Sequence, residues 1–326
     1  MGVRDTVERE TLMKIGMITD SLGNLSFEAM LKASAELKLE TLEFACGNWS
    51  SAPHLKLDRM LESEKARKEF KAKVKDHGLE IAALNCSGNQ LAPGDYGKRH
   101  DAVVRKTFKL AKLMGIHRVV MMSGLPGGPG DANPNWIITA WPPEATKALN
   151  WQWDKVAIPY WKKLSKLGKD CGIDKICIEI HGGQLVYNTE TMAKLRDAAG
   201  DNVGANYDPS HMMWMGGEPL TGIRKLGEAI FYVHAKDTRI DRQNADPNTL
   251  LETKTNERVR DRSWNYVTLG YGHNESWWRD FVSLLAQVGY NDVLSIEHED
   301  LAMTPMEGMR RSVELLDRVI IRDVVH

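Results

Sequence analysis

The chain has 326 residues, of which 42% are hydrophobic and 27% are charged, and its formal net charge is -1. This composition is typical of a globular protein, and the near-neutral charge argues against a nucleic-acid partner, which favours a basic face. No apolar run reaches the roughly 18–20 residues that a membrane helix needs, and the charged first dozen residues do not form a secretory signal. We therefore expect a cytoplasmic protein that binds neither nucleic acid nor a membrane.

Residues 1–12 carry mixed charge without a period, and we expect a flexible extension there, followed by a single domain over residues 13–326. Short apolar runs predict eight strands, at residues 14–19, 41–45, 80–84, 118–122, 176–180, 203–207, 230–233 and 293–296. Apolar stripes at helical spacing predict helices between them, at residues 27–37, 61–76, 103–114, 159–167, 191–198, 220–226, 277–288 and 306–320.

Two long connections interrupt this alternation, at residues 123–153 and 238–272. The first contains a Gly/Pro-rich run without the lysine of a phosphate-binding loop, so we interpret it as a loop shaped by glycine and proline. It also carries four tryptophans, and a long ordered loop of this kind is often a lid, here one suited to sugar rings. These are Trp136, Trp141, Trp151 and Trp153.

Four cysteines, none in a CxxC spacing, are interpreted as small buried hydrophobic residues rather than disulfide or zinc ligands: Cys46, Cys86, Cys171 and Cys177. Eight strands that alternate with helices predict a parallel sheet, and this number over about 310 residues favours a closed (β/α)8 TIM barrel of the α/β class. An open doubly wound sheet is the alternative, but no strand is followed by a GxGxxG turn.

Polar side chains follow four consecutive predicted strands. Active sites of such barrels lie at the carboxyl ends of the strands, so we expect these side chains to converge. Two glutamates, one aspartate and one histidine form an oxygen and nitrogen ligand set without thiolates, which suits Mn²⁺, Mg²⁺ or Co²⁺ better than structural zinc. The residues at these strand ends are Glu179 and His181, Asp208 and His211, His234 and Lys236, and Glu297 and Glu299.

The motifs Ile-Glu-Ile-His, Tyr-Asp-Pro-Ser-His, Val-His-Ala-Lys-Asp and Ser-Ile-Glu-His-Glu, in this order, resemble those of the xylose-isomerase-like TIM barrels, the sugar isomerase/epimerase superfamily. The resemblance covers residues 13–322. It implies that one divalent metal, with Mn²⁺ as the first candidate, is bound by Glu179, Asp208, His234 and Glu297, and that Glu179 and Glu297 are also the catalytic acid/base pair. Candidates for binding substrate are His181, His211, Lys236, Arg239 and Glu299, although Lys236 and Arg239 also suit salt bridges at the barrel rim.

The expected chemistry follows from the charges. A metal that chelates a sugar carbonyl and its neighbouring hydroxyl stabilises the enediolate left when a carbon-bound proton departs. One glutamate removes that proton, and a second group returns it. We therefore expect a metal-dependent sugar or keto-sugar isomerase or epimerase.

Other functions remain open at this stage. The strand-eight region also resembles enzymes that act on 3-oxo-glycosides, including the large subunit of C-glycoside deglycosidases, which implies a lyase with a small β-rich partner subunit. We therefore expect the small-molecule partner to be a carbohydrate substrate. We expect the assembly to be either a homo-oligomer or a hetero-oligomer with that small β-rich subunit. An endonuclease-IV-like repair enzyme needs further histidines after strands two and three, where this chain has Cys46, Asn48, Asn85 and Ser87. A non-catalytic sugar-binding barrel is the remaining alternative.

We expect His298 to pack behind the barrel, because it faces away from Glu297 and Glu299.

Overall fold

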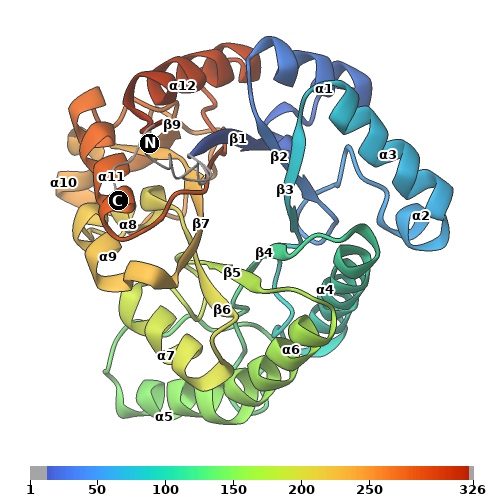
Figure 1. Ribbon diagram of the computed structural model, residues 1–326. Helices are drawn as coiled ribbons and strands as arrows, with labels where there is room; N and C mark the ends of the chain where they lie inside the picture. Colours follow the sequence, from blue (N-terminus) through green and yellow to red (C-terminus); the bar gives the residue numbers. More distant parts are fainter. Residues whose placement is uncertain (1–12, 323–326) are drawn as a thin grey trace, which may run out of the picture.

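The computed structural model describes residues 13–322, so the extension predicted over residues 1–12 lies outside the described residues. Eight parallel strands close into a barrel in the order β1-β10-β7-β6-β5-β4-β3-β2. Figure 1 shows the barrel with the helices arranged around it. The predicted (β/α)8 fold is therefore confirmed. The barrel strands are β1 (Lys14–Ile18), β2 (Thr41–Ala45), β3 (Glu80–Asn85), β4 (Arg118–Met122), β5 (Lys175–Glu179), β6 (Val203–Tyr207), β7 (Ile230–Ala235) and β10 (Val293–Ile296).

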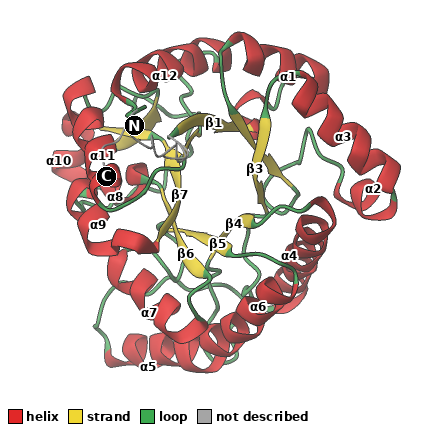
Figure 2. Ribbon diagram, viewed as in Figure 1, coloured by secondary structure: helices red, strands yellow, loops and turns green. Residues whose placement is uncertain are grey.

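Helices surround the barrel on its outside (Figure 2). Within residues 13–322, no helix combines the length and the apolar character that a membrane span requires. The α-helices are α1 (Phe27–Glu36), α2 (Leu57–Glu62), α3 (Glu64–Asp76), α4 (Gly94–Met114), α5 (Pro143–Trp151), α6 (Ile158–Asp170), α7 (Thr189–Ala199), α8 (Pro209–Trp214), α9 (Pro219–Leu226), α10 (Arg242–Asn248), α11 (Glu275–Gln287) and α12 (Pro305–Val319).

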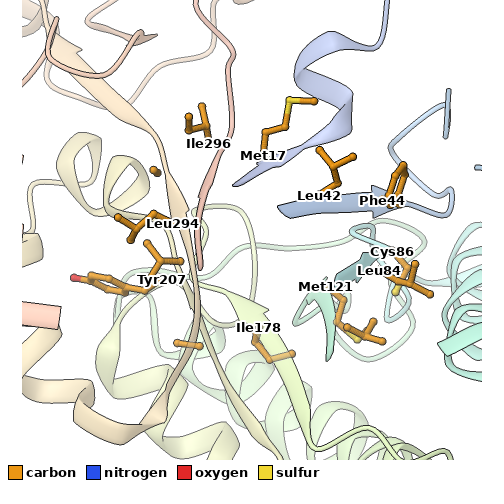
Figure 3. Packing of buried hydrophobic residues seen from close by; sticks show 14 of the residues in the cluster. Met17, Leu42, Phe44, Leu84, Cys86, Met121, Ile178, Tyr207, Leu294 and Ile296 are labelled. Atoms are coloured by element: carbon orange, nitrogen blue, oxygen red, sulfur yellow. The ribbon is translucent and has the colours of Figure 1, made fainter. Parts of the chain in front are cut away.

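The main hydrophobic core lies between the strands and the helices. Successive strand residues point to opposite faces, so every second side chain of a barrel strand packs against the helix layer. Phe44 of β2 meets Phe70 of α3 edge to face, with ring centroids 4.8 Å apart, and Tyr207 of β6 stacks on Phe281 of α11. Figure 3 shows further members of this cluster, among them Met17, Leu42, Met121, Ile178 and Leu294.

A smaller apolar cluster involves five of the barrel strands, and its members include Val120, Cys177 and Tyr232. Arg118 lies over the ring of Tyr232 and pairs with Asp292, so these side chains close the barrel interior towards its amino end. All four cysteines are free thiols, and Cys171 alone is only partly buried, which largely confirms the prediction.

Two helix boundaries differ from the sequence prediction. The helix predicted over residues 61–76 is broken at Ser63, whose backbone is extended and whose Oγ accepts a hydrogen bond from the backbone N–H of Ala66. Serine in this role caps a new helix, so α2 ends and α3 begins there. Helix α4 begins at Gly94, nine residues before the predicted start, because its first turns are polar and show no apolar stripe.

The connection at residues 123–153 is not a loop throughout, because it contains helix α5 near its end. Helix α5 buries none of its side chains, which explains why no apolar stripe indicated it. A π-helical stretch, Gln152–Ala157, joins it to α6, and the buried amide of Gln152 donates hydrogen bonds to the carbonyl oxygens of Pro126 and Asn135. The four tryptophans are not equivalent: Trp153 is buried, whereas Trp141 is 74% exposed.

The connection at residues 238–272 also contains regular structure. Strand β8 (Asp237–Ile240) pairs antiparallel with β9 (Trp264–Val267), and α10 lies between them. The segment 249–263 joins α10 to β9. It is held by Glu252, whose carboxylate accepts hydrogen bonds from the backbone N–H groups of Lys254 and Ser263. Burial raises the pKa of Glu252, but these hydrogen bonds outweigh it and lower the pKa to about 2.

Asp237, at the start of β8, fixes the turn that follows β9. One carboxylate oxygen accepts hydrogen bonds from the backbone N–H groups of Gly270, Gly272 and His273, at 2.9–3.1 Å. A Cβ atom at Gly272 would lie 2.3 Å from the carbonyl oxygen of Thr238, so only glycine fits this approach.

We expect Asp237→Ala to lower the free energy of unfolding by about 3 kcal/mol or more, because each buried N–H group left without an acceptor costs about 1–3 kcal/mol. Urea unfolding monitored by circular dichroism measures the change. Asp280→Ala, at an exposed position of α11, is the matched control and should stay within about 0.5 kcal/mol of wild type. Equal losses in both variants would contradict this role of Asp237.

We expect the stabilisation contributed by Glu252 to depend on pH. The pKa of Glu252 is lower in the folded protein than in the unfolded chain, so its contribution is complete above about pH 4.5 and disappears as the pH falls towards 2. Urea unfolding of wild type and Glu252→Gln between pH 3 and 7 should therefore show a difference that shrinks below about pH 4.5. Glu144→Gln, at an exposed position of α5, should show no such trend, and a Glu252 difference that grew in acid would overturn the assignment.

Candidate functional site

Four side chains converge at the carboxyl end of the barrel. Glu179 ends β5, Asp208 follows β6, His234 lies near the end of β7, and Glu297 follows β10. One oxygen or nitrogen atom from each lies within 4.8 Å of the corresponding atoms of the other three. The structure thus brings together the four residues that the sequence motifs single out as metal ligands.

A buried glutamate orients the histidine of this group. Glu43, in the middle of β2, is fully buried, and its Oε2 lies 2.9 Å from His234 Nε2. Asn85 and Ser295 donate further hydrogen bonds to the same carboxylate. With Nε2 engaged, His234 turns Nδ1 towards Glu297 Oε2 at 3.3 Å, and this buried Nδ1 has no hydrogen-bond partner among the described residues.

Helix α8 positions Asp208 and His211. Asp208 is its N-cap, with Oδ1 accepting a hydrogen bond from the Ser210 backbone N–H at 2.8 Å, and proline at the first helical position favours this start. One turn later, His211 Nε2 lies 2.9 Å from Glu179 Oε1 and 3.2 Å from Asp208 Oδ2. Burial lowers the pKa of His211, but the charge of Asp208 outweighs it and raises the pKa to about 9.

Lys236 brings a positive charge to the same place. Its Nζ lies 2.7 Å from Glu297 Oε2, 3.1 Å from Asp208 Oδ2 and 3.2 Å from Glu299 Oε2. The ammonium group also lies over the ring of Tyr266, 4.6 Å from its centroid. Burial lowers the pKa of Lys236, but the neighbouring carboxylates outweigh it and hold the pKa well above its ordinary value.

The pKa values of three neighbouring carboxylates shift downwards, opposite to those of His211 and Lys236. Burial raises the pKa of Glu297, but Lys236 and His234 outweigh it and hold the pKa well below its ordinary value. The pKa of Asp208 is likewise well below its ordinary value, chiefly because Lys236 and His211 outweigh the cost of burial. The pKa of Glu179 is also lowered, since its hydrogen bond from His211 outweighs burial. All three carboxylates are therefore ionised near neutral pH.

A cavity of about 520 Å³ lies above this group. Its volume falls in the range of small-molecule sites, and most of the residues that line it are polar. Glu179 and Glu297 line the cavity, whereas Asp208 and His234 are fully buried and do not. Other parts of its wall are contributed by Asp20, Trp49, Asn85, Met122, Asn256, Glu257 and Leu301.

Of the residues expected to bind substrate, some line this cavity and others do not. His181, Lys236 and Glu299 line the cavity. His211 is fully buried beneath it, with Nδ1 3.0 Å from Tyr266 Oη, so both of its ring nitrogens are engaged within the protein. Arg239 is exposed and lines a neighbouring cavity instead of this one. His181 lies beyond the end of β5, and burial together with the charge of His211 lowers its pKa to about 4.

His298 combines two positions. Its ring packs against Gly308 of α12, where a Cβ atom would lie 2.0 Å from the ring, in line with the expected position behind the barrel. The residue nevertheless contributes to the cavity wall.

Several residues of the site were not singled out by the sequence. Glu43 carried one signal, a charged residue inside an apolar strand. Asp20 carried a similar one at the end of β1, and burial raises its pKa. The expected lid is also placed differently, because the wall of the cavity includes Asn256 and Glu257, whereas no residue of 123–153 lines it.

Comparisons with known proteins agree with the barrel fold. The family model described as "Xylose isomerase-like TIM barrel" matches residues 31–319. The uncharacterized protein YfiH of Bacillus subtilis (strain 168) is 50% identical over 311 residues, which are 94% of this chain and 99% of that protein.

Two solved structures share the fold at low sequence identity. A D-tagatose 3-epimerase-like protein has a TM-score of 0.63 and 19% identity, over 94% of this chain and 98% of that one. The IolI protein, whose crystal structure holds a zinc atom, has a TM-score of 0.62 and 20% identity, again over 94% and 98% of the two chains. The family model covers most of the chain, and the protein therefore belongs to the xylose isomerase-like TIM barrel family.

Proposed function

We propose that the protein is a divalent-metal-dependent sugar or keto-sugar isomerase or epimerase. The observation that carries the proposal is the position of Glu179 and Glu297, which belong to the four-residue group and also line the cavity. Their strands, β5 and β10, are three places apart in a ring of eight, so the carboxylates approach the cavity from nearly opposite sides. Two bases on opposite sides of a bound sugar suit the removal of a proton from one face and its return to the other.

The donor set fits a divalent cation. Metal–ligand distances of about 2.0–2.2 Å place opposite ligands slightly over 4 Å apart, in agreement with the 4.8 Å limit within this group. His234 Nδ1 is buried without a hydrogen-bond partner among the described residues, as expected of an atom that faces an ion. Oxygen and nitrogen donors favour Mn²⁺, with Mg²⁺ and Co²⁺ as alternatives, and the zinc atom in the IolI structure adds Zn²⁺ to the ions to be tested.

The residues of the site would have different roles in the reaction. A bound divalent ion would supply Lewis-acid polarisation of the carbonyl beside the carbon that exchanges its proton. Glu179 and Glu297, ionised at neutral pH, would remove and return that proton. Lys236 and His181 line the cavity and would bind substrate oxygens, while His211 would hold Glu179 in place from below.

A lyase that acts on 3-oxo-glycosides is the second candidate, and the position of Glu299 favours it. Elimination needs an acid for the leaving group in addition to the base. Glu299 lines the cavity beside Glu297, and desolvation raises its pKa, with Lys236 opposing and Glu297 adding to the rise. A carboxyl group that keeps its proton more readily than Glu297 would be suited to protonate a departing oxygen.

The proposed chemistry is tested by proton exchange in heavy water. The metal-loaded protein should introduce deuterium at the carbon beside the carbonyl of a keto-sugar or a 3-oxo-glucoside, observed by NMR. We expect Glu297→Gln to slow the exchange by at least about 100-fold, because general-base catalysis contributes 10²–10⁴. The assays are run at saturating Mn²⁺ with the metal content measured.

Glu228→Gln, at an exposed position before β7, is the matched control and should exchange at the wild-type rate. Full exchange by Glu297→Gln with metal bound would refute the role of Glu297 as a base. Release of an alcohol or phenol together with exchange would select the lyase, and absence of exchange across the whole panel would count against both functions.

The role of Glu43 is tested by metal affinity. We expect Glu43→Gln to weaken Mn²⁺ binding by about 10–100-fold, because a carboxylate behind a ligand histidine fixes its orientation and raises its basicity. Isothermal titration calorimetry measures the affinity, and near-ultraviolet circular dichroism checks that the fold is kept. Glu36→Gln, exposed on α1, is the control. Unchanged affinity in Glu43→Gln would show that His234 does not depend on Glu43 to bind the ion.

A further inference from the structure

A second cavity adjoins the first. Its volume is about 180 Å³, and three residues, Asn256, Glu299 and Leu301, line both cavities. Tyr266 also lines the second cavity, and its ring lies against the ammonium group of Lys236, which lines the first. The two cavities therefore lie side by side and share part of their walls.

The second cavity differs from the first in chemistry, since apolar side chains dominate its wall. The side chains concerned are Val259, Tyr266, Val267, Tyr271, Ala302 and Met303. An apolar cavity of about 150 Å³ is large enough to bind benzene, so this space holds one six-membered ring but not a second sugar with its hydroxyl groups hydrogen-bonded.

The charged residues around this cavity are engaged elsewhere, with one exception. Arg262 donates hydrogen bonds to the carbonyl oxygens of Trp264 and Lys254, and Asp300 accepts them from the Thr268 N–H and hydroxyl groups. Glu299 pairs with Lys236. Arg239 forms no ion pair with any described residue, so its guanidinium is available to an oxygen acceptor on a ligand.

We propose that the second cavity is a subsite for one apolar ring that the substrate carries, with Arg239 binding an acidic oxygen on that ring. The inference rests on the proposed function for the sugar in the first cavity. It narrows the substrate class to sugars that bear a flat ring substituent, such as aryl glycosides. Free monosaccharides would not fill the second cavity.

Binding without chemistry gives the first test, because each cavity contains one methionine. In protein labelled with ¹³C at the methionine methyl groups, Met303 reports on the second cavity and Met122 on the first. Benzoate should shift the Met303 signal and leave Met122 unchanged. Ala302→Trp, which fills the cavity from an exposed position, should abolish the shift.

Two further variants separate the charge of Arg239 from the shape of the cavity. Arg239→Gln should weaken benzoate binding about tenfold but change the binding of neutral benzamide less than twofold, since a charge-assisted hydrogen bond is worth a factor of about this size. Arg242→Gln, exposed and paired with Asp246, is the matched control and should bind both probes as wild type does. A Met303 signal that stays in place up to the solubility limit of benzoate would overturn the proposal.

Turnover gives the second test. The rate of proton exchange, as kcat/KM, should be at least about tenfold higher for phenyl 3-oxo-β-D-glucoside than for the methyl glycoside. The advantage should disappear in Ala302→Trp while exchange of the methyl glycoside persists. Equal rates in wild type would overturn the subsite and leave the proposed function intact. A Met303 shift in a metal-loaded protein without exchange on any sugar would overturn the proposed function and leave an aryl-binding cavity.

Discussion

The attraction between buried carboxylates and the cationic side chains packed among them holds the mouth of the barrel together. Glu43, Glu179 and Asp208 are buried and Glu297 is partly buried beside them, so unpaired charges there would be costly. His211, His234 and Lys236 each contact at least two carboxylates, so no carboxylate in this set lacks a cationic neighbour. Such networks contribute little net stability, but loss of one partner is severe, which ties the positions of all these side chains to one another.

A different interaction, in which a carboxylate accepts backbone hydrogen bonds, fixes the walls above this layer. Asp237 holds the turn after β9, Glu252 holds the segment 249–263, and Asp300 joins Thr268 to the loop after β10. These three anchors lie in connections that carry no apolar stripe. They explain how long polar segments can shape two adjoining cavities and not simply cover the surface. A site on a rigid scaffold with loops held in this way is already formed before a ligand arrives.

The sequence was most informative where the barrel itself imposes the geometry. Parallel strands end at one edge, so the first polar residues after four apolar strands had to converge, and Glu179, Asp208, His234 and Glu297 do so. Glu43 was not predicted, because it acts through His234 and lies 191 residues before it. Helix α8 was too short to leave a periodic pattern, and it buries His211 instead of presenting it to the cavity.

Arg239 shows a further limit of prediction from the sequence. It follows the His-Ala-Lys-Asp motif closely in sequence, but the pairing of β8 with β9 decides which way its side chain faces. That pairing joins residues about 25 positions apart and has no local signal. Segments 123–153 and 238–272 were both predicted as long connections, yet only the second lines the cavity. Which of two insertions lines a site is a property of tertiary contacts that composition does not determine.

The hydrogen bonds that position Asp208 and Glu179 also limit their denticity. Oδ1 of Asp208 is committed to the backbone of α8, and Oε1 of Glu179 is committed to His211, so each carboxylate has one other oxygen to offer an ion, and that of Asp208 is shared with Lys236. Oε2 of Glu297 is shared with Lys236 in the same way. With the single nitrogen of His234, the protein offers four donor atoms. An ion that prefers six ligands would have two coordination positions left over, the number that two adjacent oxygens of one sugar can fill.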